Sequence, residues 1–334
     1  MIAAEVEIAK ERSGWPVRRT LLALGIAPAT YYRQQGRTAG GRRARPVVVA
    51  EALPEERAAV EAFARRHPEL RHRALAWTMV DQDVACLSPS TVYRILRRGG
   101  LVPEWAPPQR RRSKPLPRPS RPNAQWQTDL RYVKVGELTY YLLVFLDIYS
   151  RCIVHHELLR RMDGRTVALA AQAALEQLPE RARTGICIQS DNGSAFVSGE
   201  FARVLAVHGV GHHRIWPHTP EQNAFVERVI RTVGEPLHEE ELTSFTEAQH
   251  AIAEIITWYN HDRLHSALGY LTPVTVHAGL ASHVQDQRRQ KLAAARAHRR
   301  AVNLGRRQLP LPLNVTPTSQ KGPSTVNSAL SHFA

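Results

Sequence analysis

The chain has 334 residues, 43% of them hydrophobic, which is enough for about two or three small domains with cores of their own. Its formal net charge of +15 and pI of about 10.4 favour a polyanionic partner, and nucleic acid is the first candidate. No apolar stretch reaches the roughly 20 residues of a membrane helix, the N-terminus has no lipidation motif or apolar leader, and Cys86, Cys152 and Cys187 are too widely spaced for a disulfide framework or zinc knuckle. These features predict a bacterial, cytoplasmic, nucleoid-associated protein with no membrane partner.

Residues 1–105 are predicted to form short helices that include a helix-turn-helix. The pattern Pro-x-Thr-x-Tyr-Arg occurs at 28–33 and again at 89–94, a constant offset of 61 residues. The second copy has Ser88 as N-cap and Gly99–Gly100 as its stop, and each copy follows a helical stretch and a turn. Two ordinary helical hairpins are the alternative. The basic balance of the chain favours DNA binding, and the predicted contacts are Thr91, Tyr93, Arg94, Arg97 and Arg98.

Two basic segments surround the centre of the chain. Residues 106–123 hold six prolines and six Lys or Arg, which predicts an extended, semi-rigid linker whose charges follow a phosphate backbone, with Arg110, Arg111 and Arg112 as DNA contacts. Residues 281–310 carry eight Lys or Arg against one Asp, and the last twenty-odd residues are rich in Ser, Thr and Pro. We therefore expect 281–334 to be a basic, largely disordered tail.

Residues 124–280 have the pattern of an α/β domain. Three β-rich stretches at 126–135, 139–148 and 152–159 precede a helix at 166–178, and the second stretch is apolar enough for a strand covered on both faces. Short strands at 186–191 and 211–216 then alternate with helices at 200–208, 220–237 and 246–259. This order predicts a mixed sheet with flanking helices. Thr219, Pro220 and Gln222 predict a capping box at the start of the helix at 220–237.

Three carboxylates of this domain stand where chemistry could use them. Asp129 lies inside an apolar strand, where an unpaired charge is costly, and Asp191 ends a strand at the edge where α/β proteins bind ligands. Glu227 shares a helical face with Asn223 and Arg231, four residues away on either side, and both are predicted DNA contacts. Each acid alone could be a strand-end, turn or surface ion-pair residue.

The combined motifs resemble the integrase-type (DDE) transposases of bacterial insertion sequences, in the retroviral-integrase catalytic core superfamily. Thirty-five residues separate Asp191 from Glu227, the usual spacing of that family. The resemblance covers about residues 120–280, and the matching residues are Trp126, Asp129, Tyr141, Leu142, Asp147, Tyr149, Ser150, Arg151, Ser190 to Ser194, Phe196, Asn223, Glu227, Tyr259, Asn260, Arg263, His265, Leu268, Tyr270, Thr272 and Pro273.

The resemblance implies a ribonuclease-H-like core in which Asp129, Asp191 and Glu227 are both the catalytic residues and the metal ligands. Two Mg²⁺ ions, with Mn²⁺ as a substitute, would serve in-line phosphoryl transfer. The implied protein is a homo-multimeric DNA transposase that nicks the terminal inverted repeats of an element and joins the 3′-hydroxyl to target DNA. The alternatives are a ribonuclease-H-like nuclease that cuts without joining, and a decayed or repurposed DNA-binding protein without catalysis.

The sequence departs from the family pattern at two positions, and two further groups of residues could be mistaken for functional sites. Many relatives carry Lys or Arg seven residues after the glutamate, where this chain has Gly234, and the usual Arg-Pro-His reads Arg263–Leu264–His265. Asp147 is interpreted as the organiser of the turn to Arg151. The pairs His155–His156 and His212–His213 are not interpreted as chelates, because adjacent strand residues point to opposite faces.

Overall fold

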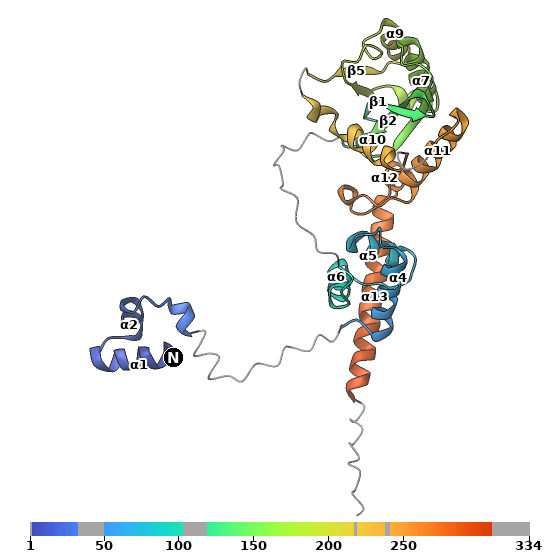
Figure 1. Cartoon of the computed structure of the whole chain (residues 1–334). Coiled ribbons are helices and arrows are strands. Elements are labelled where there is room, and N and C mark those ends of the chain that lie inside the picture. Colours follow the sequence, from blue (N-terminus) through green and yellow to red (C-terminus); the bar gives the residue numbers. More distant parts are fainter. Residues whose placement is uncertain (1, 33–49, 103–118, 217–218, 238–240, 309–334) are drawn as a thin grey trace, which may run out of the picture. The chain divides into compact units, whose positions relative to one another are not determined.

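The computed structural model of the chain describes residues 2–32, 50–102, 119–216, 219–237 and 241–308 (Figure 1). These residues fall into two compact units, one with residues from both ends of the chain and one formed by residues 52–298. Most of the predicted linker, with Arg110, Arg111 and Arg112, and the last residues of the predicted tail lie outside the described residues.

The N-terminal residues form a small helical group. It contains α1 (Ile2–Ser13), α2 (Val17–Ala23) and a helical segment at residues 28–32. Val6, Leu21 and Tyr31 are buried together at its centre. The short helices predicted for this end of the chain are present, and the helical segment at 28–32 falls on the first copy of the repeated pattern.

A second helical group carries the predicted helix-turn-helix. Its helices are α4 (Pro54–Arg66), α5 (His72–Asp81) and α6 (Pro89–Arg98), and α6 packs on both of the others. The Ser88 hydroxyl accepts a hydrogen bond from the Thr91 N–H at 3.3 Å, and Gly100 ends the helix with a φ of +67°. The predicted start and stop of α6 are therefore confirmed.

The expected tail is corrected over residues 281–308, which form one helix, α13 (Ala281–Gln308). Ala and Arg are strong helix formers, so a sequence poor in large apolar residues still becomes helical when it has something to pack on. Arg288 provides that contact, because its guanidinium donates to both carboxylate oxygens of Asp81 at 2.7 and 2.6 Å and to the Tyr270 carbonyl at 2.9 Å. The Trp77 ring lies 4.9 Å from the same group.

The catalytic-core candidate is a five-stranded sheet in the order β3-β2-β1-β4-β5. The first three strands pair antiparallel, and β4 and β5 add in parallel, so the predicted mixed, ribonuclease-H-like sheet is confirmed. The strands are β1 (Gln125–Val135), β2 (Leu138–Asp147), β3 (Ile153–Leu159), β4 (Cys187–Ser190) and β5 (Gly211–Arg214).

Helices cover both faces of this sheet (Figure 1). On β2, Leu142, Val144 and Leu146 pack with α10 and α11, whereas Leu143 and Phe145 pack with α7 and α9. This alternation explains why the strand is apolar throughout. The helices are α7 (Gly164–Glu176), α8 (Glu180–Arg183), α9 (Gly199–Val207), α10 (Ala224–Leu237), α11 (Phe245–His261) and α12 (Pro273–His277), with short 3₁₀ turns η1 (Pro220–Asn223) and η2 (Ser266–Leu268).

The described residues contain no helix that is both long and apolar enough to span a bilayer. All three cysteines are free thiols, and Cys152 is buried.

The Arg288 contact gives a first prediction. Arg288 is 4% exposed, so Arg288→Ala should lower the free energy of unfolding by about 2–4 kcal/mol, because it leaves Asp81 and the Tyr270 carbonyl without their donor. Urea unfolding measures the loss. Arg289→Ala, at an exposed position one residue away, is the matched control and should change stability by less than about 0.5 kcal/mol. Equal losses in the two variants would contradict the anchoring role of Arg288.

Candidate functional site

Asp129 lies in the middle of β1, on the sheet face that α10 covers. Side chains alternate along a strand, so Gln127 and Arg131 share this face with it. Gln127 bonds to the start of α10, at Gln222 and Val226, and Arg131 donates to the carbonyls of Ile230 and Gly234 at 3.5 and 3.4 Å. Asp129, midway between these anchors, therefore lies opposite the turn of α10 that carries Glu227.

Asp191 directly follows β4, the parallel neighbour of β1. Gln127 and Gln189 are register partners on these strands, so each acid lies two residues beyond a member of the same pair. One Asp191 carboxylate oxygen accepts a hydrogen bond from the Gly193 N–H at 2.9 Å. A Cβ at Gly193 would lie 3.0 Å from that oxygen, a tight contact, so a side chain there would require the Asp191 carboxylate to shift.

Glu227 is exposed in the first turn of α10. The predicted capping box before it is wrong: the segment starts as the 3₁₀ turn η1, and the Thr219 hydroxyl donates to the Trp216 carbonyl at 2.5 Å instead of capping the helix. The Gln222 side chain accepts from the Trp216 N–H at 3.0 Å. Asn223, the last residue of η1, is only 2% exposed, so its side chain is not open to solvent as a DNA contact requires.

The Asp129 carboxyl is affected by the charges of the other two acids. Its pKa is raised to about 6, mainly by burial, with contributions from the charges of Asp191 and Glu227 and against a hydrogen bond from the Leu130 N–H that lowers it. Both other carboxylates are therefore near enough to Asp129 to repel its charged form. The three predicted acids therefore lie around the carboxyl end of β4, with Asp129 on β1, Asp191 directly after β4 and Glu227 on α10.

The donor chemistry of these acids fits a hard divalent cation, which takes carboxylate oxygens and water. Asp129 and Asp191 each commit one oxygen to a neighbouring backbone N–H, and the other oxygen accepts no hydrogen bond from the described residues. Within the part of the chain that the structure describes, no three His, Cys, Asp or Glu side chains are grouped closely enough to hold an ion. A cation would therefore have to draw the three acids closer together.

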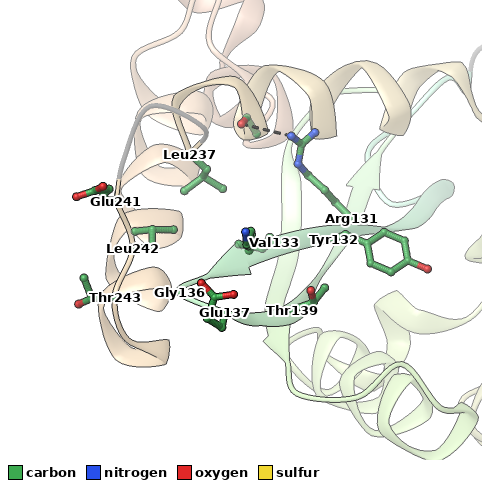
Figure 2. A pocket seen from close by; sticks show the side chains of 12 residues that line it. Arg131, Tyr132, Val133, Gly136, Glu137, Thr139, Leu237, Glu241, Leu242 and Thr243 are labelled. Atoms are coloured by element: carbon green, nitrogen blue, oxygen red, sulfur yellow. Dashed lines mark hydrogen bonds between the residues drawn. The ribbon is translucent and has the colours of Figure 1, made fainter.

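Gly234, the departure from the usual basic residue, forms a notch for Arg131. A Cβ at position 234 would overlap the Arg131 guanidinium, which reaches across from β1 to α10 (Figure 2). The notch borders an open cavity of about 670 Å³ between the β1–β2 turn and the segment after α10, with Lys134, Glu137 and Glu241 in its wall. Position 234 is thus tied to Arg131, whose guanidinium takes up the space that a larger residue on the helix would need.

The predicted DNA contacts divide into two groups. Arg94, Arg97 and Arg98 on α6 and Arg231 on α10 are exposed, as such contacts require. Thr91 and Tyr93 already have partners, since the Thr91 hydroxyl bonds to Ser88 and to Arg94 and the Tyr93 ring lies 5.0 Å from His72. The buried amide oxygen of Asn223 finds no hydrogen-bond partner among the described residues.

Asp147 is confirmed as a structural residue. It is fully buried, and its carboxylate accepts from the Asn123 N–H at 2.9 Å, the Ser150 N–H at 2.8 Å and the Ser150 hydroxyl at 2.5 Å. Its carbonyl accepts from the Arg151 N–H at 2.8 Å, which closes the predicted turn.

The residues around Asn260 and His265, which belong to the last motif of the family pattern, also have a structural role. Asn260 brackets Ile153, accepting from its N–H at 3.0 Å and donating to its carbonyl at 2.9 Å. Burial, together with the charges of Arg263, Arg151 and Arg228, lowers the pKa of His265 to about 3, so this histidine is neutral at pH 7.

Sequence analysis missed Gln127 and Gln189, which are 1% and 6% exposed. A signal was present, because each glutamine precedes a strand acid by two residues and so shares its face.

The matches to known proteins fall on the part of the chain that contains the sheet and its helices. Family models described as "Integrase core domain" match residues 119–220 and 208–273. The chain is 30% identical over 155 residues to the transposase for insertion sequence element IS904 of Lactococcus lactis, covering 46% of this chain and 60% of that protein. It is 24% identical over 211 residues to the putative transposase InsK for IS150 of Escherichia coli, covering 63% of this chain and 72% of that protein.

Among solved structures, the integrase catalytic core domain of HTLV-2 in complex with magnesium, in its trimeric form, is 21% identical with a TM-score of 0.38. This likeness covers 48% of the present chain and 99% of that one. The match to the lactococcal transposase covers less than two thirds of that relative's own length.

The raised pKa of Asp129 gives a stability prediction. Because the folded state binds this proton more tightly than the unfolded state, with a pKa of about 6 against 3.8, the free energy of unfolding should fall as the pH rises from about 4 to 6. Asp129→Asn should remove this fall and stabilise the protein by up to about 3 kcal/mol at pH 8, with little change at pH 4. Urea unfolding at both pH values measures the effect, with Asp262→Asn, an exposed carboxylate, as control. An equal effect at both pH values would refute it.

The Gly234 notch gives a prediction about coupling. Gly→Ala in a helix interior ordinarily stabilises by about 0.5–1 kcal/mol, but here the new methyl group would displace the Arg131 guanidinium from its carbonyl partners. Gly234→Ala should therefore be stabilising in an Arg131→Ala background and neutral or destabilising in the wild type. A double-mutant cycle measured by thermal unfolding should give a coupling of about 1 kcal/mol. Strictly additive effects would mean that the notch has no energetic role.

Proposed function

We propose that this chain is a DNA transposase of the DDE type, with Asp129, Asp191 and Glu227 as its catalytic residues. The match of residues 119–220 and 208–273 to family models described as integrase core domain supports this proposal. The observation that carries it is the effect of the Asp191 and Glu227 charges on the Asp129 carboxyl, because the three acids come from three separate elements.

The three carboxylates would hold two Mg²⁺ ions, or Mn²⁺ in their place. When bound, the ions would activate the attacking oxygen and stabilise the leaving oxygen of an in-line displacement. The chain's own part is to supply oxygen donors on a sheet edge and to keep them oriented, through the Leu130 N–H for Asp129 and the Gly193 N–H for Asp191. The attacking group is water in the cutting step and the freed 3′-hydroxyl of the element in the joining step. Neither step requires a covalent bond between protein and DNA.

DNA is the proposed partner throughout. The exposed Arg94, Arg97 and Arg98 on α6 suit phosphate and base contacts within the element's terminal inverted repeats, and Arg231 suits a backbone contact beside Glu227. Joining requires two element ends and the target DNA to be held together, so the active form is a homo-multimer on DNA.

The proposal is tested by conservative changes to each acid. Asp129→Asn, Asp191→Asn and Glu227→Gln should each reduce cutting and joining of inverted-repeat DNA by more than about 100-fold, which exceeds the loss typical of residues that only support a metal ligand. DNA affinity should be unchanged, because the contacts that set it lie elsewhere. Strand-transfer assays and gel shifts measure the two properties, and Glu221→Gln, an exposed acid six residues before Glu227, is the matched control.

Other outcomes identify the rival functions. Nicked product without joined strands in the wild type would favour a nuclease on the same domain. Full DNA binding with no reaction in the wild type, under every divalent cation tested, would favour a DNA-binding protein without catalysis.

A further inference from the structure

We propose that the buried side-chain amides of Gln127 and Gln189 are positioning residues that set Glu227 against Asp129 and Asp191 for cation binding. This inference deepens the function proposed above and rests on it. It assigns a role to a pair of residues that lie next to the acids along the chain but are not cation ligands themselves.

Both the nitrogen and the oxygen of the Gln127 side-chain amide form hydrogen bonds. Its nitrogen donates to the Gln222 carbonyl at 2.5 Å, and its oxygen accepts from the Val226 N–H at 3.1 Å. These partners are a carbonyl and an N–H, so only one orientation of the amide satisfies both. Gln127 therefore hydrogen-bonds to both η1 and the first turn of α10. Its partner in α10, Val226, immediately precedes Glu227.

Gln189 attaches the same turn to the next strand. Its nitrogen donates to the Gln222 carbonyl at 3.0 Å, and its oxygen accepts from the Gln125 amide at 2.7 Å. The Gln222 carbonyl thus receives two donors, one from β1 and one from β4. Asp129 and Asp191 lie two residues further along these strands, so a single backbone oxygen relates the elements that carry all three acids.

The helix start explains why this support is needed. The first N–H groups of a helix have no partner within the helix, and Thr219 does not cap them. The Gln127 side-chain oxygen, which does not belong to the helix, accepts the hydrogen bond of the Val226 N–H. Gln127 is 1% exposed, so water cannot take the place of this oxygen. Without this hydrogen bond, the Val226 N–H would be unpaired and the first turn of α10 would tend to shift. Cation ligands tolerate little displacement, because metal–oxygen distances are narrowly fixed.

A purely structural role is the alternative, and the two roles predict different measurements. A structural role lowers stability and affects cation binding no more than any other equally destabilising change. A positioning role weakens cation binding specifically. Residues that orient metal ligands typically cost 10–100-fold in affinity when they are replaced.

The test compares four full-length variants with the wild type. Gln127→Met removes both bonds at similar volume, and Gln189→Met removes its own bonds but leaves the Gln127 grip intact. Leu205→Ala is a matched destabilising control, because Leu205 is 2% exposed in the core on the opposite face of the sheet. Asp129→Asn serves as the reference without a working site. Calorimetric titration with Mn²⁺ in the absence of DNA gives the dissociation constant, and urea unfolding gives the stability of each.

We expect Gln127→Met to raise the Mn²⁺ dissociation constant by about 10–100-fold, Gln189→Met to raise it by less, and Leu205→Ala to leave it unchanged. If Gln127→Met binds Mn²⁺ as tightly as the wild type, the positioning role is overturned and the proposed function stays intact. If Gln127→Met does not fold, the same conclusion follows from wild-type affinity in Gln189→Met. A loss in Leu205→Ala equal to that in Gln127→Met would overturn it as well. Wild type that binds Mn²⁺ no better than Asp129→Asn would overturn both proposals.

Discussion

The burial of the Asp129 carboxylate is the constraint on which this domain depends. Burial is the main cause that raises its pKa to about 6, and the charges of the half-buried Asp191 and the exposed Glu227 also act against its ionised form. A domain selected only for stability would replace such a residue. Under the proposed function, binding of a divalent cation would offset the free energy that Asp129 costs at neutral pH, so the arrangement would favour an occupied site over stability of the empty protein.

The rest of the architecture holds these charges together. The antiparallel β1–β2 pair fixes Asp129 opposite Val144, and the parallel β1–β4 pair brings Asp191 to the same edge. The glutamine amides and Arg131 then attach α10 to β1 at two points, before and after the turn that carries Glu227. Both attachments are polar and directional, so they fix the height of α10 along β1. The apolar contacts of Val226 and Val233 alone would permit sliding.

The sequence predicted the sheet well because β2 is apolar on both faces and the helices have clear periods. It predicted α13 poorly, since the ion pair that stabilises this helix joins Arg288 to Asp81 across 207 positions of sequence. The start of α10 was predicted wrongly for a related reason. Thr219, Pro220 and Gln222 fit a capping box, but the Gln222 carbonyl bonds to the distant Gln127 amide, and the Thr219 hydroxyl and the Gln222 side chain bond to Trp216 nearby in the chain. Local patterns identify elements, whereas long-range polar contacts decide their ends.

Gly234 illustrates how a strand side chain can constrain the sequence of the helix that packs on it. Any side chain at this position would compete with the Arg131 guanidinium, which reaches from β1 and donates to the Ile230 and Gly234 carbonyls. Because the group bonds to two α10 carbonyls, its position is more restricted than that of a lysine projecting from the helix. The cost is that the helix must contain a glycine. The identities of residues 131 and 234 are therefore coupled, and a change at either one alters the space available to the other.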